Sequence, residues 1–277
     1  MMRKYFLLLL LIAGYSLKGQ DTAAINTIGL QYGIHLFARQ DQVFSAMVYH
    51  DISFGNLNLN FSNEKGKRIH FAEAEFNLYD ASSQGPYDYQ TGFDSIKTMT
   101  TLPSGFTVVT VRYAYLRHWK TNSSGAWWVG GMLDNQINSI DNQYGPAATF
   151  GYFAHFSLAP MVLWKSQLTD RKGIYASAWL PLINWVSRSA YAIQDDEYMQ
   201  QNDDHNGLKT FFRYVGDGNL HLINRYQQFN LNLGYTYSLP SHWSFGAEYR
   251  FEFLRDTKPK TIISYQNYFN LKASYLF

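Results

Sequence analysis

Residues 263–277, ISYQNYFNLKASYLF, show the clearest structural pattern in the chain. Its odd positions are almost all apolar or aromatic, whereas its even positions are mostly polar. The odd positions are Ile263, Tyr265, Asn267, Phe269, Leu271, Ala273, Tyr275 and Phe277. Successive side chains of a β-strand point to opposite faces, so this alternation predicts a strand with one apolar and one polar face.

The same alternation recurs along the chain. It is clear in residues 57–62, 72–78, 109–115, 150–158, 229–238 and 243–253. Residues 126–134 and 174–186 are strand-like with a blurred alternation, and residues 25–37 have the weakest pattern. Together with the C-terminal segment, these patterns predict about ten strands, within a range of roughly eight to twelve because residues 41–54 could form another.

The composition places these strands in a membrane. Aromatic residues make up 18% of the chain and charged residues 16%, whereas a soluble domain carries roughly 25% charged residues. After the N-terminal segment no window holds about 18 successive apolar residues, which excludes helical spans. A closed barrel is then the remaining way to cross a bilayer, because it leaves no backbone group unpaired. The net charge of +2 and the lack of a basic stretch exclude nucleic acid as a partner.

The N-terminus resembles an export signal. Arg3 and Lys4 precede an apolar run from Phe6 to Ala13, which is shorter than the about 20 residues of a spanning helix. We therefore expect a cleaved signal peptide over residues 1–20 and a single domain over residues 21–277. The chain has no cysteine, which excludes disulfides and thiolate metal sites, and we expect no cofactor and no metal.

The predicted connections alternate in length. Residues 63–67, 120–125, 168–173 and 239–242 are brief and rich in turn-forming residues. Residues 80–104 and 187–220 are far longer and lack periodicity. Short turns at one end and longer loops at the other are typical of a barrel whose two termini lie on the same side.

The C-terminal Phe277, which follows Leu271 and Tyr275, resembles the C-terminal signature of bacterial outer-membrane β-barrels. The resemblance implies an all-β, antiparallel, up-and-down transmembrane barrel in the outer membrane of a Gram-negative bacterium. Short turns would face the periplasm and longer loops the outside. The implied partners are outer-membrane lipid, periplasmic chaperones and the barrel-assembly machinery, which would read Phe277 as its signal; other envelope proteins remain open as partners.

The polar faces of the predicted strands carry ionisable residues that would line the interior. They are Glu73, Glu75, Arg112, His155, Glu248, Arg250, Glu252 and Lys272. Glu73 and Glu75 lie on the strand next to Arg112, and Arg250 with its neighbouring glutamates lies beside Lys272. Opposite charges should pair, because a buried charge without a partner is costly. Either a salt-bridged polar core or a narrow charged pore for small solutes fits this pattern.

His155 and Ser157 share the predicted inward face and are weak catalytic candidates. A His–Ser pair on a barrel wall resembles the outer-membrane phospholipase and lipid A deacylase families, in which the imidazole takes the serine proton. In those families the pair faces the lipid, whereas the alternation here turns His155 inward. Successive residues on one strand face are also roughly 7 Å apart.

The long segment 187–220 and the residue after it are rich in acidic residues and histidine. These residues are Asp195, Asp196, Glu197, Asp203, Asp204, His205, Asp217 and His221. The strand count and this composition resemble the omptin family of outer-membrane proteases, although none of the family's motifs occurs in matching order. The spacing fits no EF-hand or zinc signature, so a solvated loop or a loose Ca²⁺ site is an alternative.

Two aromatic features suggest sugar or partner binding. They are the loop 87–93 and the Trp127–Trp128 pair. A girdle at the membrane boundary explains the tryptophans more simply. The sequence as a whole predicts a non-enzymatic barrel, narrow or plugged, that serves as a small-solute pore or as a structural or partner-docking barrel. The alternative is a barrel hydrolase, either a lipid esterase or an omptin-like protease.

Overall fold

The first strand pairs with the last. In the computed structural model, which describes residues 24–91, 97–144, 147–190 and 207–277, β1 (Ile25–Asp41) runs antiparallel to β14 (Ile262–Leu276). Their register extends from the pair Thr27–Leu276 to the pair Asp41–Ile262. The N–H groups of Asn26 and Phe277 also donate to each other's carbonyl oxygens, both at 2.9 Å. This pairing closes the sheet into a barrel.

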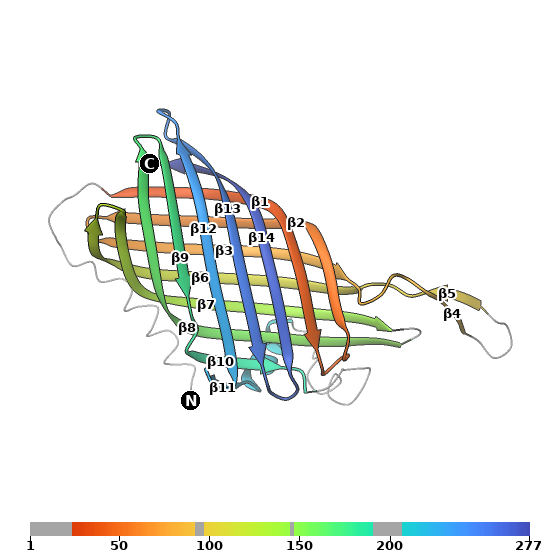
Figure 1. Ribbon diagram of the computed structural model, residues 1–277. Helices are drawn as coiled ribbons and strands as arrows, with labels where there is room; N and C mark the ends of the chain where they lie inside the picture. Colours follow the sequence, from red (N-terminus) through yellow and green to blue (C-terminus); the bar gives the residue numbers. More distant parts are fainter. Residues whose placement is uncertain (1–23, 92–96, 145–146, 191–206) are drawn as a thin grey trace.

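The wall is a closed antiparallel barrel of ten strands, as the alternation predicts (Figure 1). After β1 the strands are β2 (Val48–Lys65), β3 (Arg68–Ala81), β6 (Ser104–Asn122), β7 (Gly125–Tyr144), β8 (Ala147–Thr169), β9 (Lys172–Trp179), β10 (Ile183–Arg188), β11 (Asn219–Leu222), β12 (Tyr226–Ser238), β13 (Trp243–Asp256) and β14. β9 and β10 both pair with β8 and together form one wall strand; β11 and β12 form the next. Among the described residues no helix is long and apolar enough to cross a membrane.

The predicted short turns lie at the end of the barrel that carries β1's start and β14's end, which we call the terminal end. They join Lys65 to Arg68, Asn122 to Gly125, Thr169 to Lys172 and Ser238 to Trp243. Gly125 adopts a φ of 141°, which L side chains rarely adopt, so glycine is needed at this turn. The opposite end, which we call the loop end, carries the two long connections.

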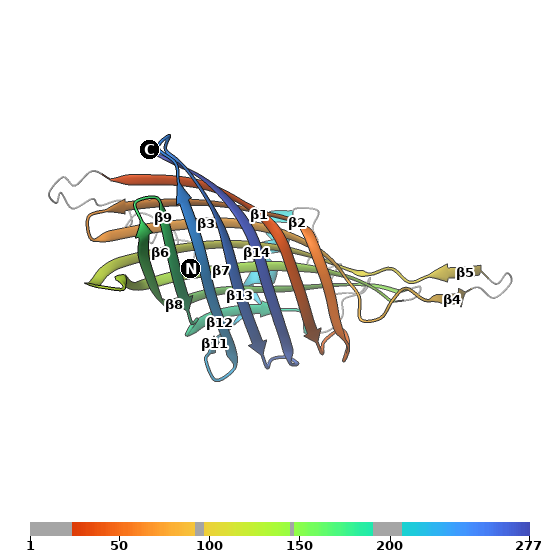
Figure 2. The ribbon, with the colours of Figure 1, turned by 45° about the horizontal axis from the view of Figure 1, so that its top comes forward.

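Each long connection contains structure of its own. β4 (Asp88–Thr91) and β5 (Lys97–Thr100) form a hairpin that stands clear of the barrel (Figures 1 and 2). α3 (Gly207–Gly216) packs on the outer face of β10, where the indole of Trp185 donates to the Val215 carbonyl at 2.9 Å. Tyr214 stacks on Tyr152 of β8 with ring centroids 4.5 Å apart. Both connections therefore present ordered elements at the loop end.

The expected single strand over residues 174–186 is broken at Pro181. Leu180 and Leu182 still donate their N–H groups to β8, at 3.3 and 3.0 Å. Successive N–H groups of a strand face opposite neighbours, so the nitrogen of Pro181 faces the wall strand formed by β11 and β12. Proline has no N–H to donate there, and the pairing is interrupted. Beyond the break the pairing resumes in a shifted register, from Trp179–Asn230 to Ile183–Leu222.

The outer face of the wall is apolar, and the interior is packed. Large side chains that alternate outward are exposed, as Leu30 (46%), Tyr32 (56%) and Leu59 (51%) illustrate. Inside, an apolar cluster fills the terminal end, and two more fill the loop end. The terminal-end cluster is Ile69, Ala114, Leu116, Trp128, Met132, Ala159, Met161, Leu163 and Trp179. The loop-end clusters are Phe37, Tyr79, Ala81, Phe106, Val108 and Ile140, and Phe153, Val186, Tyr226, Leu254 and Ile262.

Candidate functional site

Two arginines occupy the middle of the barrel, between the apolar clusters. Arg112 comes from β6 and Arg250 from β13, and both meet the carboxylates of Glu73 and Glu75 on β3. Arg112 Nη1 lies 2.7 Å from Glu73 Oε1 and 3.3 Å from Glu75 Oε2. Arg250 Nη1 lies 2.9 Å from Glu73 Oε1 and 2.6 Å from Glu75 Oε2. Because both arginines share both glutamates, the four side chains form one unit.

Three further carboxylates complete this unit. Arg112 Nε lies 3.0 Å from Asp134 Oδ1, and its Nη2 lies 2.5 Å from Glu252 Oε1. Arg250 Nη2 lies 3.2 Å from Glu248 Oε1. None of these seven side chains is more than 4% exposed. We call Glu73, Glu75, Arg112, Asp134, Glu248, Arg250 and Glu252 the ion-pair layer.

Neutral side chains satisfy many of the remaining carboxylate oxygens in the ion-pair layer. Glu75 accepts from Asn77 at 2.6 Å and from Asn58 at 3.3 Å. Asp134 accepts from the Trp179 indole at 2.9 Å and from Gln228 at 3.1 Å. Buried charges are tolerated when they are paired and hydrogen-bonded, so this network keeps the charges in place.

The pairing differs in one respect from the sequence expectation. Glu73 and Glu75 do contact Arg112 on the neighbouring strand, as expected. Lys272, however, does not pair with Glu248, Arg250 or Glu252: it is half-buried and makes no ion pair with any described residue. Arg250 instead reaches across the lumen to β3, because the curvature of a narrow barrel brings opposite walls within the length of an arginine side chain.

A second set of polar contacts closes the loop end. Arg188, at the end of β10, donates to the Asp41 carboxylate at the end of β1. It also donates to the carbonyl oxygens of Lys258 and Lys260, at 3.2 and 2.5 Å, in the connection between β13 and β14. A single buried guanidinium therefore joins three segments of the barrel mouth, since its planar fork presents several donors at once.

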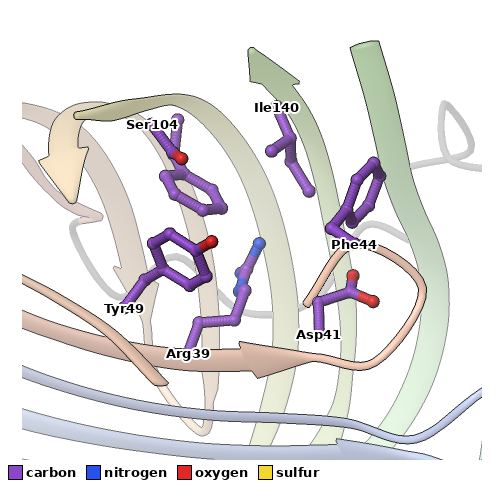
Figure 3. A pocket seen from close by; sticks show the side chains of 7 residues that line it. Arg39, Asp41, Phe44, Tyr49, Ser104 and Ile140 are labelled. Atoms are coloured by element: carbon purple, nitrogen blue, oxygen red, sulfur yellow. The ribbon is translucent and has the colours of Figure 1, made fainter. Parts of the chain in front are cut away.

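The connection between β1 and β2 folds over this mouth. The Asp41 carboxylate accepts from Val43 N at 3.0 Å, and its carbonyl accepts from Phe44 N at 3.0 Å. Phe44 then packs against Gly151 of β8. A Cβ added at Gly151 would lie 1.9 Å from the Cζ atom of Phe44. Figure 3 shows Phe44 beside Ile140, with Arg39 on the other side of a cavity of only 10 Å³.

His155 and Ser157 lie on the inward face of β8, where the alternation predicts them. They are 0% and 3% exposed, so neither side chain reaches the lipid face. Neither ring nitrogen of His155 has a hydrogen-bond partner among the described residues. Transfer of the serine proton requires a Ser–His hydrogen bond, and this structure does not contain one.

Only part of the acidic segment falls in the described residues. Asp195, Asp196, Glu197, Asp203, Asp204 and His205 lie outside them. His221 of β11 pairs through Nδ1 with Asp256 Oδ1 of β13 at 3.0 Å. The described part of the chain holds no group of three or more His, Cys, Asp or Glu residues placed to bind a metal ion. The predicted signal peptide, residues 1–20, also lies outside the described residues.

Sequence reasoning missed Asp134, Arg39 and the Asp41–Arg188 pair. Arg39 is 1% exposed, and its guanidinium lies over the Phe37 ring, 5.0 Å from the centroid. Arg39 and Asp41 share the parity of His35 and Phe37, so extending the first predicted strand by four residues would have found them. Asp134 is the last residue of the predicted segment 126–134 and points inward, where it is 0% exposed.

Phe277 ends the chain at the terminal end of the barrel. Its side chain is 60% exposed and points outward, while its backbone pairs with Asn26. The residue therefore combines a fixed backbone with an accessible ring.

No family model matches the sequence, and no curated protein matches it. The structure is similar to the outer-membrane protease OmpT of Escherichia coli, with a TM-score of 0.57 and 7% identity over 95% of this chain and 99% of that chain. The translocator domain of the autotransporter NalP from Neisseria meningitidis (TM-score 0.45, 8% identity) covers 98% of this chain and 94% of its own. Neisserial surface protein A (TM-score 0.38, 8% identity) covers 92% and 100%. At these identities the likeness concerns the fold alone: the chain has the closed β-barrel fold of bacterial outer-membrane proteins.

Proposed function

We propose that this chain is a closed, non-enzymatic outer-membrane barrel that does not conduct solutes and that acts by presenting its loop end to a partner. The observation that carries the proposal is the ion-pair layer. Its two arginines reach carboxylates on β3, β7 and β13, so the charges span the lumen instead of lining a passage through it.

The energetics of the ion-pair layer support a permanently filled interior. Opening a passage would separate guanidinium groups from carboxylates that are no more than 4% exposed. Removing one partner of a buried ion pair costs about 3–5 kcal/mol. The apolar clusters on either side of the layer would also have to rearrange.

The loop end supports the docking role. β4 and β5 extend away from the wall (Figure 2). Every side chain of β5 is exposed. A two-stranded hairpin without a third strand or a packed face is marginally stable in water. A partner that packs on the hairpin would supply the missing contacts.

We further propose an outer-membrane location, with residues 1–20 as a cleaved signal peptide. The apolar outer face of the wall would then contact lipid, and the accessible ring of Phe277 would be the assembly signal. The implied partners during export are periplasmic chaperones and the barrel-assembly machinery.

Single-channel recording in planar bilayers tests the closed barrel. Folded protein, verified by its β-sheet circular dichroism, is expected to give no discrete current steps. Steps whose size or ion selectivity changes in Arg250→Ala or Lys272→Ala would instead assign the interior to a small-solute pore. Arg255→Ala is the matched control, because Arg255 lies on the same strand as Arg250 but is exposed.

A further inference from the structure

A cleft of about 520 Å³ opens at the base of the β4–β5 hairpin. Three segments that are distant in sequence line it: residues 45–49 after β1, residues 81–87 before β4, and residues 101–104 after β5. The volume is within the range of about 300–1,000 Å³ that is usual for small-ligand sites. The cleft lies at the loop end, away from the lipid-facing wall.

The lining of this cleft carries no charge. None of its thirteen residues is Asp, Glu, Lys, Arg or His. Hydroxyl and amide groups come from Ser45, Ser82, Ser83, Gln84, Thr101 and Ser104, and apolar side chains from Met47, Ala81, Leu102 and Pro103. Tyr49 and Tyr87 add two aromatic rings. Hydroxyl and amide groups bind other hydroxyls, and aromatic faces pack on apolar C–H surfaces.

The neutral lining is specific to this cleft. A second loop-end cavity, of about 470 Å³, is lined by Arg188, Asp217, His221, Arg225 and Lys258. The two cavities at this end of the barrel therefore differ in chemistry, one neutral and one charged.

Two backbone pairings join the segments that line the cleft. His50 and Ser82 exchange both backbone hydrogen bonds, at 2.9 and 3.1 Å. Thr101 N donates to Tyr87 O at 3.0 Å, and Tyr87 N donates to Thr101 Oγ1 at 3.1 Å. An extended peptide docks on a strand edge through free backbone groups, and these groups are not free. The lining therefore favours a ligand that binds through side chains.

We infer that the cleft binds a neutral carbohydrate, and that this is the class of partner to which the loop end is presented. The inference rests on the proposed docking role of the loop end. Sugar hydroxyls would meet the serine, threonine and glutamine side chains, and the C–H face of a pyranose would pack on the Tyr87 ring, which is 43% exposed. The absence of charge in the lining excludes the uronate and sulfate groups of acidic glycans, which would be desolvated without a counter-charge.

Calorimetric titration of the folded full chain tests the inference, in a detergent without a sugar head group. The neutral probes are maltohexaose, cellohexaose and laminarihexaose; the comparison probes are a hexamer of galacturonate and an extended Ser/Thr-rich peptide. At least one neutral hexasaccharide is expected to bind saturably, and more tightly than either comparison probe. Tyr87→Ala should weaken that binding by about five- to tenfold, since an aromatic contact supplies roughly that much.

Two variants keep the test independent of hairpin folding. Tyr87→Leu retains an apolar side chain without the ring and should weaken binding as Tyr87→Ala does. Tyr89→Ala is the matched control, because Tyr89 is a hairpin tyrosine outside the cleft. Failure of all three neutral probes, tighter binding of the acidic hexamer or the peptide, or equal binding by wild type and both Tyr87 variants would each overturn the carbohydrate inference. If the carbohydrate inference fails but planar bilayers show no current steps, the closed-barrel proposal still holds. Current steps would overturn the closed-barrel proposal itself.

Discussion

Arg250 on β13 and Glu75 on β3 meet across the lumen, with 2.6 Å between Nη1 and Oε2, although β2, β1 and β14 lie between their strands in the wall. The contact crosses the lumen and does not join neighbouring strands. Each strand of the wall pairs only with its two neighbours, so contacts across the lumen such as this one are what brace the barrel's cross-section.

Replacing Arg250 with Ala is expected to destabilise the barrel by about 3–5 kcal/mol, because Glu73 and Glu75 would lose a buried cationic partner. The free energy of unfolding in detergent micelles, from denaturant titration, measures the effect. Arg255→Ala should change it by no more than about 0.5 kcal/mol, because Arg255 is exposed on the same strand. Equal values for the two variants would contradict a structural role for the ion-pair layer.

Replacing Gly151 with Val should displace Phe44 from the barrel mouth, because a Cβ at residue 151 would lie 1.9 Å from the phenyl ring. The chain has no cysteine, so a single Ser45→Cys substitution reports on the β1–β2 connection through its rate of maleimide labelling. We expect labelling several-fold faster in the Gly151→Val background. Gly105→Val is the control, since the nearest atom to an added Cβ there is 3.9 Å away; a rate that rises equally in both backgrounds would argue against this packing.

Replacing Arg188 with Ala should loosen the connection between β13 and β14, because the carbonyl oxygens of Lys258 and Lys260 would lose their shared donor. Trypsin should then cleave after Lys260 several-fold faster, as followed by mass spectrometry of the folded protein. Arg188→Lys should restore little protection, since an ammonium group lacks the planar fork that joins three segments. Arg225→Ala, which changes the same cavity without removing an ion pair within the described residues, should cleave at the wild-type rate; faster cleavage there would point to general loosening.

Replacing Phe277 with Ala separates assembly from stability. The backbone hydrogen bonds of Phe277 with Asn26 remain in the variant, so the free energy of unfolding should change by no more than about 0.5 kcal/mol. The amount of folded barrel in the outer membrane of expressing cells should nevertheless fall several-fold, if the ring is the assembly signal. Leu271→Ala is the control, an exposed side chain on the same strand. Normal assembly of Phe277→Ala would remove the proposed signal.

The strands of this fold were predictable because the two environments of a barrel wall impose a period of two on the sequence. The prediction failed where that period is interrupted. Within β2 a bulge opposite Gly33 and His35 inserts one residue, so the outward positions change from even, at Ile52, to odd, at Leu57. Residues 41–54 therefore looked like a possible extra strand, although residues 48–54 belong to β2.

The contacts within the interior were less predictable than the strands. Alternation assigns Arg250 and Glu75 to the inward face, but it contains no information on which inward residues meet across the lumen. That depends on barrel diameter and strand stagger, which follow from the register of all ten strands together. The Arg188–Asp41 pair was missed for a simpler reason: both residues end strands whose predicted boundaries stopped short of them.

The ion pair between Arg250 and Glu75 across the lumen also constrains how the chain reaches its native state. The two residues are 175 positions apart, and β13 is the penultimate strand. If the strands form in chain order, the glutamates of β3 have Arg112 but not Arg250 as a partner, and we expect them to stay hydrated until β13 arrives. We therefore expect half-built barrels to hold water inside and to lose it in the step in which β1 pairs with β14. Closure of the wall and loss of water from the lumen would then be one cooperative event. A late intermediate that is still open would differ from the native barrel in its hydrated interior and not in the number of its strands.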